Sequence, residues 1–461
     1  MVTLKSFLGM IAAVPFIMAC NQTGQVNATL FPASGSENVN PDTHLVLTFS
    51  ETPVLGDSGM IRVYDAVTDQ VVDSLDLSIP SGPTESRTYG PECDYTKVPY
   101  DYTRTVMPTN KDTRPGTPSG TAEPTPPVYQ LTIIGGFTDA FHFYPVIVRD
   151  SIATIYLHNN MLEYGHTYYV TIDNGVLNLA DGSFQGVTKE DEWIFTTKSD
   201  MPELSDTLIV DATGKGDFNT VQGALDFIPD FNERQTVILV NPGDYEELVY
   251  TRNKWHVKIK GAGMADTKVH YANNEVFNPH PLTVKTNEWP GTFPSRRAAF
   301  MLDNCKDIVI EDMTIATDLK GQAEGLLING ERIALYRVHI IGSGDALQAN
   351  GTIYMESCEL DGGGDTILGR GSLFAYKSNF RNGGGPFSWV RNTAGNHGNV
   401  FVECTFSTED GKQADYGRTK SNHGSAYPDA EFVLIDCKVK NIIPEGWSSI
   451  GAKTAKMYEY N

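Results

Sequence analysis

Two aspartates at the same phase of a repeating strand pattern constrain the fold of this chain more than any other feature. Asp345 and Asp365 each stand five residues after the apolar residue that ends one copy of the pattern, Ile340 and Leu360. Recurrence every 20 to about 30 residues is the signature of a solenoid with one coil per repeat. Equivalent positions on adjacent coils become neighbours, because strands in a sheet lie about 4.8 Å apart. Two carboxylates at that separation favour one acid and one base or nucleophile.

The repeat itself is a short apolar strand. Its copies start at Ile308, Ile333, Ile353, Leu373, Val400 and Phe432. Cys358, Cys404 and Cys437 share one phase of it, so we interpret them as buried core residues stacked along the solenoid rather than as disulfide bridges. No cysteine pair has metal-ligand spacing, and we expect neither a metal nor a cofactor. The alternative for the two aspartates is an ordinary Asp-Gly turn, since glycines surround both.

Length and charge limit the domain count and the partners. The chain has 461 residues, which predicts two or three domains, and its net charge is −22. This charge argues against nucleic acid and against an anionic membrane surface as partner. It also disfavours a polyanionic substrate, except where a cleft is locally basic. The arginines of the C-terminal half that can make such a cleft are Arg296, Arg297, Arg370, Arg381, Arg391 and Arg418.

Residues 1–20 have the form of an export signal. Lys5 gives a basic start, an apolar stretch follows, and Ile-Met-Ala-Cys at 17–20 resembles the cleavage box of bacterial lipoproteins. The apolar run is too short to span a bilayer permanently. We therefore predict a lipoprotein signal peptide, with Cys20 as the lipidated N-terminus of an exported protein at the bacterial outer membrane or cell surface. A plain secretory signal is the alternative.

The next segment, residues 27–198, is predicted to be a β-sandwich. Short strands such as 45–49 and 129–133 are separated by Gly, Asp, Asn and Pro turns. The opening Phe-Pro-Ala-Ser-Gly at 31–35 and the closing strand from Trp193 resemble a bacterial immunoglobulin-like domain. A long Pro/Thr/Ser-rich insertion, residues 80–127, interrupts it. Residues 199–206 are predicted to be a linker between two self-sufficient cores.

One helix is predicted at the start of the C-terminal region. Val221, Leu225 and Ile228 have helical spacing and precede Pro229. A helix here caps the first coil of the solenoid, which would otherwise expose an open sheet edge.

Several motifs in residues 207–461 occur in the order of a known family. They are Gly-Asp-Tyr-Glu-Glu at 243–247, Gln-Ala-Glu-Gly-Leu at 322–326, Gly-Asp-Ala-Leu at 344–347, Gly-Asp-Thr-Ile-Leu-Gly at 364–369, Tyr-Gly-Arg at 416–418 and Ile-Pro-Glu-Gly-Trp at 443–447. This segment resembles the pectin methylesterases, carbohydrate esterases built on a right-handed parallel β-helix. The resemblance implies an all-β chain with a catalytic β-helix behind the sandwich.

The resemblance also implies the chemistry of the site. The residue matching Asp365 attacks a methyl ester carbonyl, and the one matching Asp345 protonates departing methanol and then activates water. Arg418 would orient the Asp365 carboxylate. Gln322 would donate a hydrogen bond to the oxyanion.

Two positions depart from the family pattern. Gly344 stands where the family has a second oxyanion glutamine, so either another group such as Gln348 substitutes or turnover is slow. Thr419-Lys420 replaces a Pro-Trp pair, which removes an aromatic platform for the sugar ring. The expected substitutes for that platform are Trp389, Tyr416 and Tyr427.

The predicted function is hydrolysis of the methyl esters of pectin by a monomer, with pectin and water as partners. No nucleic acid is expected, and a membrane only through the lipid on Cys20. One alternative is a non-catalytic pectin-binding surface protein derived from an esterase. Another is a pectate-lyase-like β-helix enzyme with Ca²⁺ on Asp345, Asp361 and Asp365, which would leave Gln322 unexplained.

Overall fold

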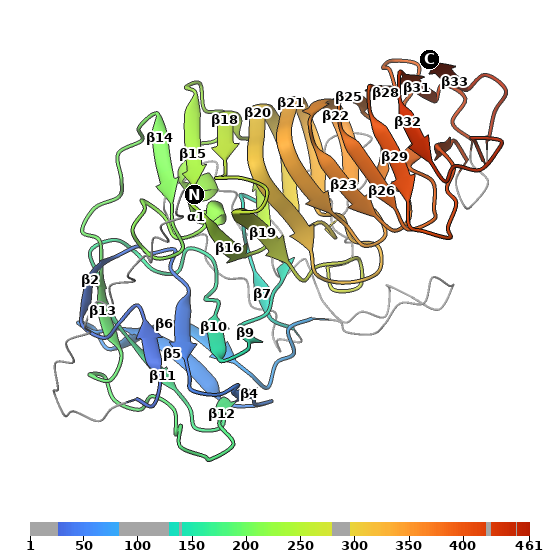
Figure 1. Ribbon diagram of the computed structural model, residues 1–461. Helices are drawn as coiled ribbons and strands as arrows, with labels where there is room; N and C mark the ends of the chain where they lie inside the picture. Colours follow the sequence, from blue (N-terminus) through green and yellow to red (C-terminus); the bar gives the residue numbers. More distant parts are fainter. Residues whose placement is uncertain (1–25, 83–128, 138–140, 279–295, 421–425, 449) are drawn as a thin grey trace, which may run out of the picture.

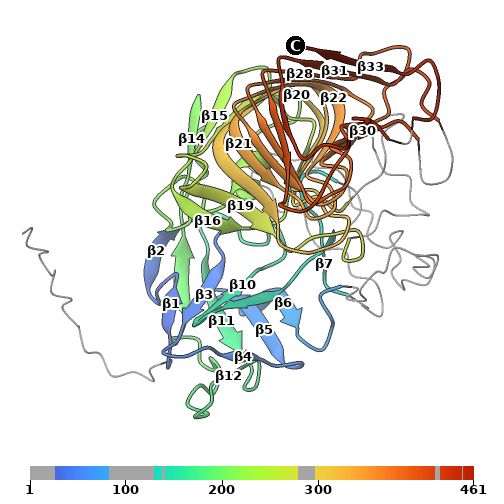
Figure 2. The same cartoon turned by 45° about the vertical axis from the view of Figure 1, so that its right-hand side comes forward.

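The computed structural model describes residues 26–82, 129–137, 141–278, 296–420, 426–448 and 450–461. They form an N-terminal β-sandwich and a long β-solenoid beside it (Figures 1 and 2). The predicted signal peptide with Cys20, most of the 80–127 insertion, and Cys93 lie outside the described residues. Within the described residues, no helix has the length and apolar content needed to cross a membrane.

The sandwich consists of a four-stranded and a five-stranded sheet, ordered β1-β3-β10-β9 and β2-β13-β11-β5-β6, with a small β12-β4 pair. Its strands are β1 (Thr29–Phe31), β2 (Ser36–Val39), β3 (Leu45–Thr48), β4 (Val54–Leu55), β5 (Met60–Asp65), β6 (Gln70–Asp76), β9 (Val146–Arg149), β10 (Ile152–Ile155), β11 (Thr167–Ile172), β12 (Leu177–Asn178) and β13 (Ile194–Thr197). Trp193 is fully buried, and its Nε1 donates to the Pro32 carbonyl at 2.8 Å. The region fits an immunoglobulin-like domain.

The expected sandwich strand at 129–133 takes a different place. Leu131–Thr132 (β7) pairs with Phe141–His142 (β8) in a two-stranded sheet of its own. The Phe141 ring lies 4.5 Å from that of Tyr250, and the His142 N–H donates to Asn278 Oδ1 at 2.8 Å, both partners being solenoid residues. The apolar side chains of this hairpin are therefore buried by the solenoid rather than by the sandwich.

The solenoid is a parallel β-helix, as the repeat predicts. Its strands are β14 (Thr207–Val210), β15 (Thr236–Val240), β16 (Gly243–Glu246), β17 (Val249–Arg252), β18 (Trp255–Lys260), β19 (Thr267–Tyr271), β20 (Phe300–Thr317), β21 (Leu326–Ile341), β22 (Leu347–Glu356), β23 (Glu359–Gly362), β24 (Ile367–Gly369), β25 (Ser372–Tyr376), β26 (Asn379–Asn382), β27 (Ser388–Val390), β28 (Asn399–Val402), β29 (Thr405–Thr408), β30 (Gly417–Arg418), β31 (Glu431–Ile435), β32 (Lys438–Lys440) and β33 (Lys456–Tyr460). Consecutive coils pair in register, so that Leu326, Leu347 and Ile367 stack in one buried column.

The predicted cap and the cysteine column are both confirmed. Helix α1 (Val221–Phe227) is buried over the first coils, and its N-cap Thr220 accepts from the Gly223 N–H. Cys358 and Cys404 are buried as free thiols along the solenoid core, and Cys437 is a partly buried free thiol packed against it.

The sandwich and the solenoid share buried structure, which corrects the expectation of two self-sufficient cores. One apolar cluster, the shared cluster, combines hairpin residues with residues of the solenoid: Ile134, Phe137, Phe141, Leu248, Tyr250, Tyr271, Phe277, Ala298, Ala299, Met301 and Leu327. The reason is that the outer face of the first coils is itself apolar and needs a cover.

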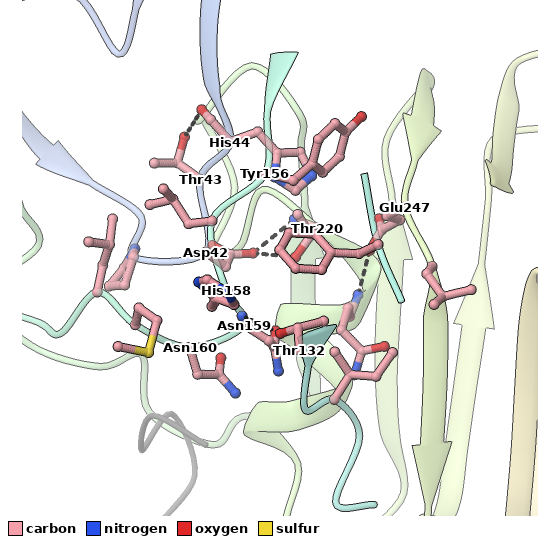
Figure 3. Close-up of a pocket in the computed structure, with 18 of the residues that line it drawn as sticks. Asp42, Thr43, His44, Thr132, Tyr156, His158, Asn159, Asn160, Thr220 and Glu247 are labelled. Carbon is pink, nitrogen blue, oxygen red and sulfur yellow. Dashed lines mark hydrogen bonds between the residues drawn. The ribbon is translucent and has the colours of Figure 1, made fainter. Parts of the chain in front are cut away.

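Polar contacts add to this interface. Asp42 of the sandwich accepts from the N–H groups of Asn219 and Thr220, while Glu247 of the solenoid accepts from Val221 and Gln222. The first turn of α1 therefore has its orphan donors satisfied from two regions at once. A pocket of about 90 Å³ lies at this junction, and Figure 3 shows Asp42 and Glu247 among the residues that line it. Neither Asp345 nor Asp365 lines this pocket.

Candidate active site

Three carboxylates stand at equivalent positions on three successive coils, and we call them the acidic row. Gly325 N–H donates to the Ala346 carbonyl and Ala346 N–H to the Thr366 carbonyl, each at 3.0 Å. The residues just before these three are Glu324, Asp345 and Asp365. The spacing predicts adjacent coils for the two aspartates, and the register confirms that placement. Glu324 was not foreseen as a third member.

Arg418 holds one end of the acidic row. Its Nε donates to Asp365 Oδ1 at 2.9 Å and its Nη2 to Oδ2 at 2.5 Å. This bidentate contact fixes the plane of the carboxylate and favours its ionised form. Arg418 lies on β30, three coils after Asp345. Its contact with Asp365 is the one that the family resemblance implies.

Arg297 holds the other end, although the sequence predicted for it only a contribution to a basic cleft. Its Nε and Nη2 donate to the carboxylate of Glu324 at 2.8 and 2.6 Å, and Nη2 also donates to Asp345 Oδ2 at 3.1 Å. Glu324 is fully buried. The available signal was the glutamate in the motif Gln-Ala-Glu-Gly-Leu at 322–326, because a buried carboxylate requires a cationic partner.

The same arginine orients Gln322. Arg297 Nη1 contacts Gln322 Oε1 at 2.5 Å. A guanidinium only donates, so the amide atom that faces it must be the oxygen. The amide nitrogen of Gln322 is thereby turned away from Arg297 and remains a hydrogen-bond donor, as an oxyanion contact would require.

Burial and neighbouring charges divide the protonation of the two aspartates. Asp345 and Asp365 are only 7% and 8% exposed. Burial raises the pKa of Asp345 to about 8; Glu324 and Asp365 add to this rise, while Arg297 and Arg391 oppose it. Burial also raises the pKa of Asp365, but the hydrogen bonds and charge of Arg418 oppose that rise. The arrangement therefore favours one shared proton, held by Asp345.

The φ angle of Gly344 does not require a glycine. It is not among the described glycines that have a positive φ. Gln348, the suggested substitute donor, lies between the core residues Leu347 and Ala349 and so points to the outer face of its strand. It is almost fully buried, and its Oε1 has no hydrogen-bond partner among the described residues.

The three aromatic residues proposed for sugar stacking have different environments. The guanidinium carbons of Arg418 and Arg391 lie 4.2 and 4.3 Å from the centre of the Trp389 ring, and Tyr427 packs on Trp389 edge to face. Trp389 thus supports the arginine that holds Asp365.

Tyr416 is not a stacking platform. Tyr416 is 4% exposed, and its ring packs in the solenoid core, 4.9 Å from the ring of Trp447. The backbone pairing of Tyr416 with Ser388 continues the ladder into β30 and directs the ring inward. The prediction that Tyr416 binds substrate is therefore wrong.

One group of side chains has the spacing of metal ligands. Oxygen and nitrogen atoms of Glu246, His270 and Asp318 lie within 4.8 Å of one another. Arg149 of the sandwich already binds Glu246 at 2.5 Å, and His270 Nδ1 contacts Asp318 at 2.5 Å. These charges are compensated within the protein, so we assign no metal to this group.

The carboxylates considered for Ca²⁺ are engaged in the same way. Asp345 contacts Arg297, Asp365 contacts Arg418, and Asp361 contacts both His339 and Arg381. No pair of them is left to chelate a cation without breaking an ion pair.

The family model described as Pectinesterase matches residues 207–456 of the chain. The chain belongs to the pectinesterase family. It is therefore a carboxylic ester hydrolase. Pectinesterase QRT1 of Arabidopsis thaliana is 26% identical over 282 residues, which cover 57% of this chain and 70% of that protein. Pectinesterase 31 of the same plant is 24% identical over 264 residues, covering 54% and 80%.

Solved structures of pectin methylesterases are also similar to this pectinesterase. The carrot enzyme has 17% identity and a TM-score of 0.46, covering 57% of this chain and 84% of its own. The enzyme from Aspergillus niger has 19% identity and a TM-score of 0.45, covering 57% and 86%.

Proposed function

We propose that this pectinesterase hydrolyses the methyl esters of polygalacturonate, with Asp365 as nucleophile and Asp345 as general acid and base. The observation that carries the proposal is the acidic row. Its two aspartates lie on adjacent coils: Arg418 favours the ionised form of Asp365, whereas burial and the neighbouring carboxylates favour the protonated form of Asp345. That division of protonation states is what a two-carboxylate ester hydrolysis needs.

In the first half of the reaction, an Asp365 oxygen attacks the ester carbonyl carbon, and the carbonyl oxygen becomes an oxyanion. Gln322 donates its amide N–H to this oxyanion. The tetrahedral intermediate then expels the methoxy group, which takes the proton of Asp345 and leaves as methanol. An acyl group remains on Asp365.

In the second half, Asp345 is ionised and acts as a base. It removes a proton from water, whose oxygen attacks the acyl carbon. Cleavage of the bond to Asp365 frees the galacturonate carboxyl group, regenerates the Asp365 carboxylate and leaves Asp345 protonated for the next cycle.

The positive charge near the acidic row supports an anionic polysaccharide as substrate despite the net charge of −22. Arg391 is 5% exposed, and its Nε has no hydrogen-bond partner among the described residues. A buried cation of this kind favours a neighbouring anion. The partly demethylated substrate supplies carboxylates for that purpose.

We also propose the division of the chain into residues 1–20 as a lipoprotein signal peptide, 27–198 as an immunoglobulin-like domain and 207–461 as the catalytic domain. The cleavage-box sequence before Cys20 and the two-sheet topology support it. The lipid would hold a monomeric enzyme at the outer membrane or cell surface.

The deciding experiment is methanol release from methylated pectin in the presence of a chelator. We expect release without added metal. Unsaturated products that require Ca²⁺ would instead indicate a lyase, and binding of pectin without any product would indicate a glycan-binding protein.

Activity should fall at high pH because Asp345 must begin protonated. Its pKa of about 8 means that the acid is present below that pH and is lost as pH rises through it. The profile of kcat/KM against pH should therefore decline above about pH 8. A profile that stays flat to pH 10 would contradict the assignment of Asp345 as the acid.

Gly344→Gln tests the missing oxyanion donor. The φ of Gly344 does not bar a side chain. If the donor is absent, the variant should raise kcat by up to about 100-fold and leave KM little changed, because the new hydrogen bond acts in the transition state. Steady-state kinetics on methylated pectin measures both. An unchanged kcat in a folded variant would mean that another group already makes this contact.

A further inference from the structure

The acidic row continues beyond the two aspartates that the proposed reaction uses. Glu324 occupies the same position on the preceding coil, is fully buried, and binds Arg297 through two nitrogen atoms. Asp345 thus lies in the middle of three carboxylates. Arg297 closes the row at one end and Arg418 at the other.

The nitrogens of Arg297 reach three acceptors. Glu324 takes Nε–H and one hydrogen of Nη2, Asp345 Oδ2 takes the other hydrogen of Nη2, and Gln322 Oε1 takes one hydrogen of Nη1. The planar guanidinium therefore fixes the amide and the carboxyl group in one relative geometry. Glu275 is a further ionic neighbour of Arg297, at 3.7 Å.

This geometry decides which oxygen of Asp345 can carry a proton. Oδ2 accepts from Arg297, and an oxygen that accepts from a guanidinium is the poorer site for a proton. The other oxygen, Oδ1, faces the next coil: a Cβ atom on Gly364 would lie 3.7 Å from it. Gly364 precedes Asp365, so the protonated oxygen is directed toward the nucleophile's coil, where the leaving group departs.

We propose that Arg297 and Glu324 are positioning residues of this pectinesterase, which together hold Gln322 as oxyanion donor and Asp345 with Oδ1 toward Asp365. The inference rests on the proposed function. Glu324 has a second effect, since its negative charge offsets that of Arg297 beside the acid. The charged groups that act on Asp345 are then Arg297, Glu324, Asp365 and Arg391.

Glu324→Gln in the full chain tests the charge balance. The substitution leaves Arg297 with less compensation beside Asp345, so the acid should lose its proton at lower pH. We expect the high-pH limb of kcat/KM for methanol release to move down by about one pH unit or more. Glu359→Gln is the matched control: it also removes a carboxylate partner of an arginine, Arg381, but away from the row. It should leave the limb in place.

Arg297→Met combined with Glu324→Val tests the positioning by removing both charges of the buried ion pair together. Such replacements of a buried ion pair are often neutral or stabilising, so the double variant should fold. Its kcat should fall by about 10- to 100-fold, because Gln322 and Asp345 lose their orientation, while KM changes little. If Glu324→Gln does not fold, the double variant alone tests whether Arg297 and Glu324 position Gln322 and Asp345.

Three outcomes separate the inference from the function on which it rests. The inference is supported if the high-pH limb of kcat/KM moves to lower pH in Glu324→Gln and kcat falls in the double variant. Folded variants that keep both the wild-type limb and the wild-type kcat overturn it. Absence of methanol release from the wild-type protein refutes the proposed function itself, before either variant is measured.

Discussion

Replacing Asp365 with asparagine is expected to reduce methanol release from methylated pectin by about four orders of magnitude or more. The amide lacks the nucleophilic oxygen that forms the acyl intermediate, and loss of a catalytic nucleophile typically has an effect of this size. The change is isosteric and keeps one acceptor for Arg418, so the protein should remain folded. Initial rates of methanol release, with thermal unfolding recorded on the same sample, measure the effect.

Asp361→Asn is the matched control for this substitution. Asp361 lies on the neighbouring strand β23 and contacts His339 and Arg381 rather than the acidic row. It should keep most of the activity. Substantial methanol release by Asp365→Asn would mean that another group is the nucleophile.

The second large effect is expected from removal of the N-terminal region. Deleting residues 1–206 uncovers the shared cluster and removes Asp42 from the start of α1. It also removes Phe137 and Phe141, whose rings pack against the guanidinium of Arg296, the neighbour of Arg297. We therefore expect the isolated solenoid to aggregate or to unfold at a much lower temperature, and to lose activity.

A single substitution tests the same interface without a deletion. Phe141→Ala removes a fully buried ring from the shared cluster and should cost about 3–5 kcal/mol of unfolding free energy. The control is Phe374→Ala, because that ring is 42% exposed on the solenoid surface and should cost far less. A folded, active fragment beginning at residue 207 would show that the shared cluster is not needed.

Part of the site could be predicted because it follows from periodicity. In a parallel solenoid, residues one coil apart become neighbours whatever the rest of the chain does. The spacing of Asp345 and Asp365 therefore predicted that they are neighbours. Arg418 was identified through the Tyr-Gly-Arg motif, which occurs in the same order along the chain as in the family. Glu324 lay hidden, because it follows Ile315 by nine residues, whereas each aspartate follows the end of its strand by five.

Other parts of the site and fold depend on contacts that do not recur with the strand repeat. Arg297 comes from the segment just before β20 and reaches Asp345, 48 residues later, across a coil. Tyr416 looked like a groove residue, yet its ring completes the core against Trp447. The hairpin of β7 and β8 alternates like a sandwich strand, but its apolar side chains match an apolar face that only the assembled solenoid presents.

The sequence by itself determined the coil, the column of small core residues and the pair of aspartates, since each is set by spacing along one repeating element. Only the tertiary structure decided how deeply these aspartates are buried and that Arg297 and Glu324 are their partners, whereas the Tyr-Gly-Arg motif already implied Arg418. The physical reason is that burial and charge balance are sums over everything packed around a group. Arg297, Glu324 and Arg418 enter that sum from three different coils.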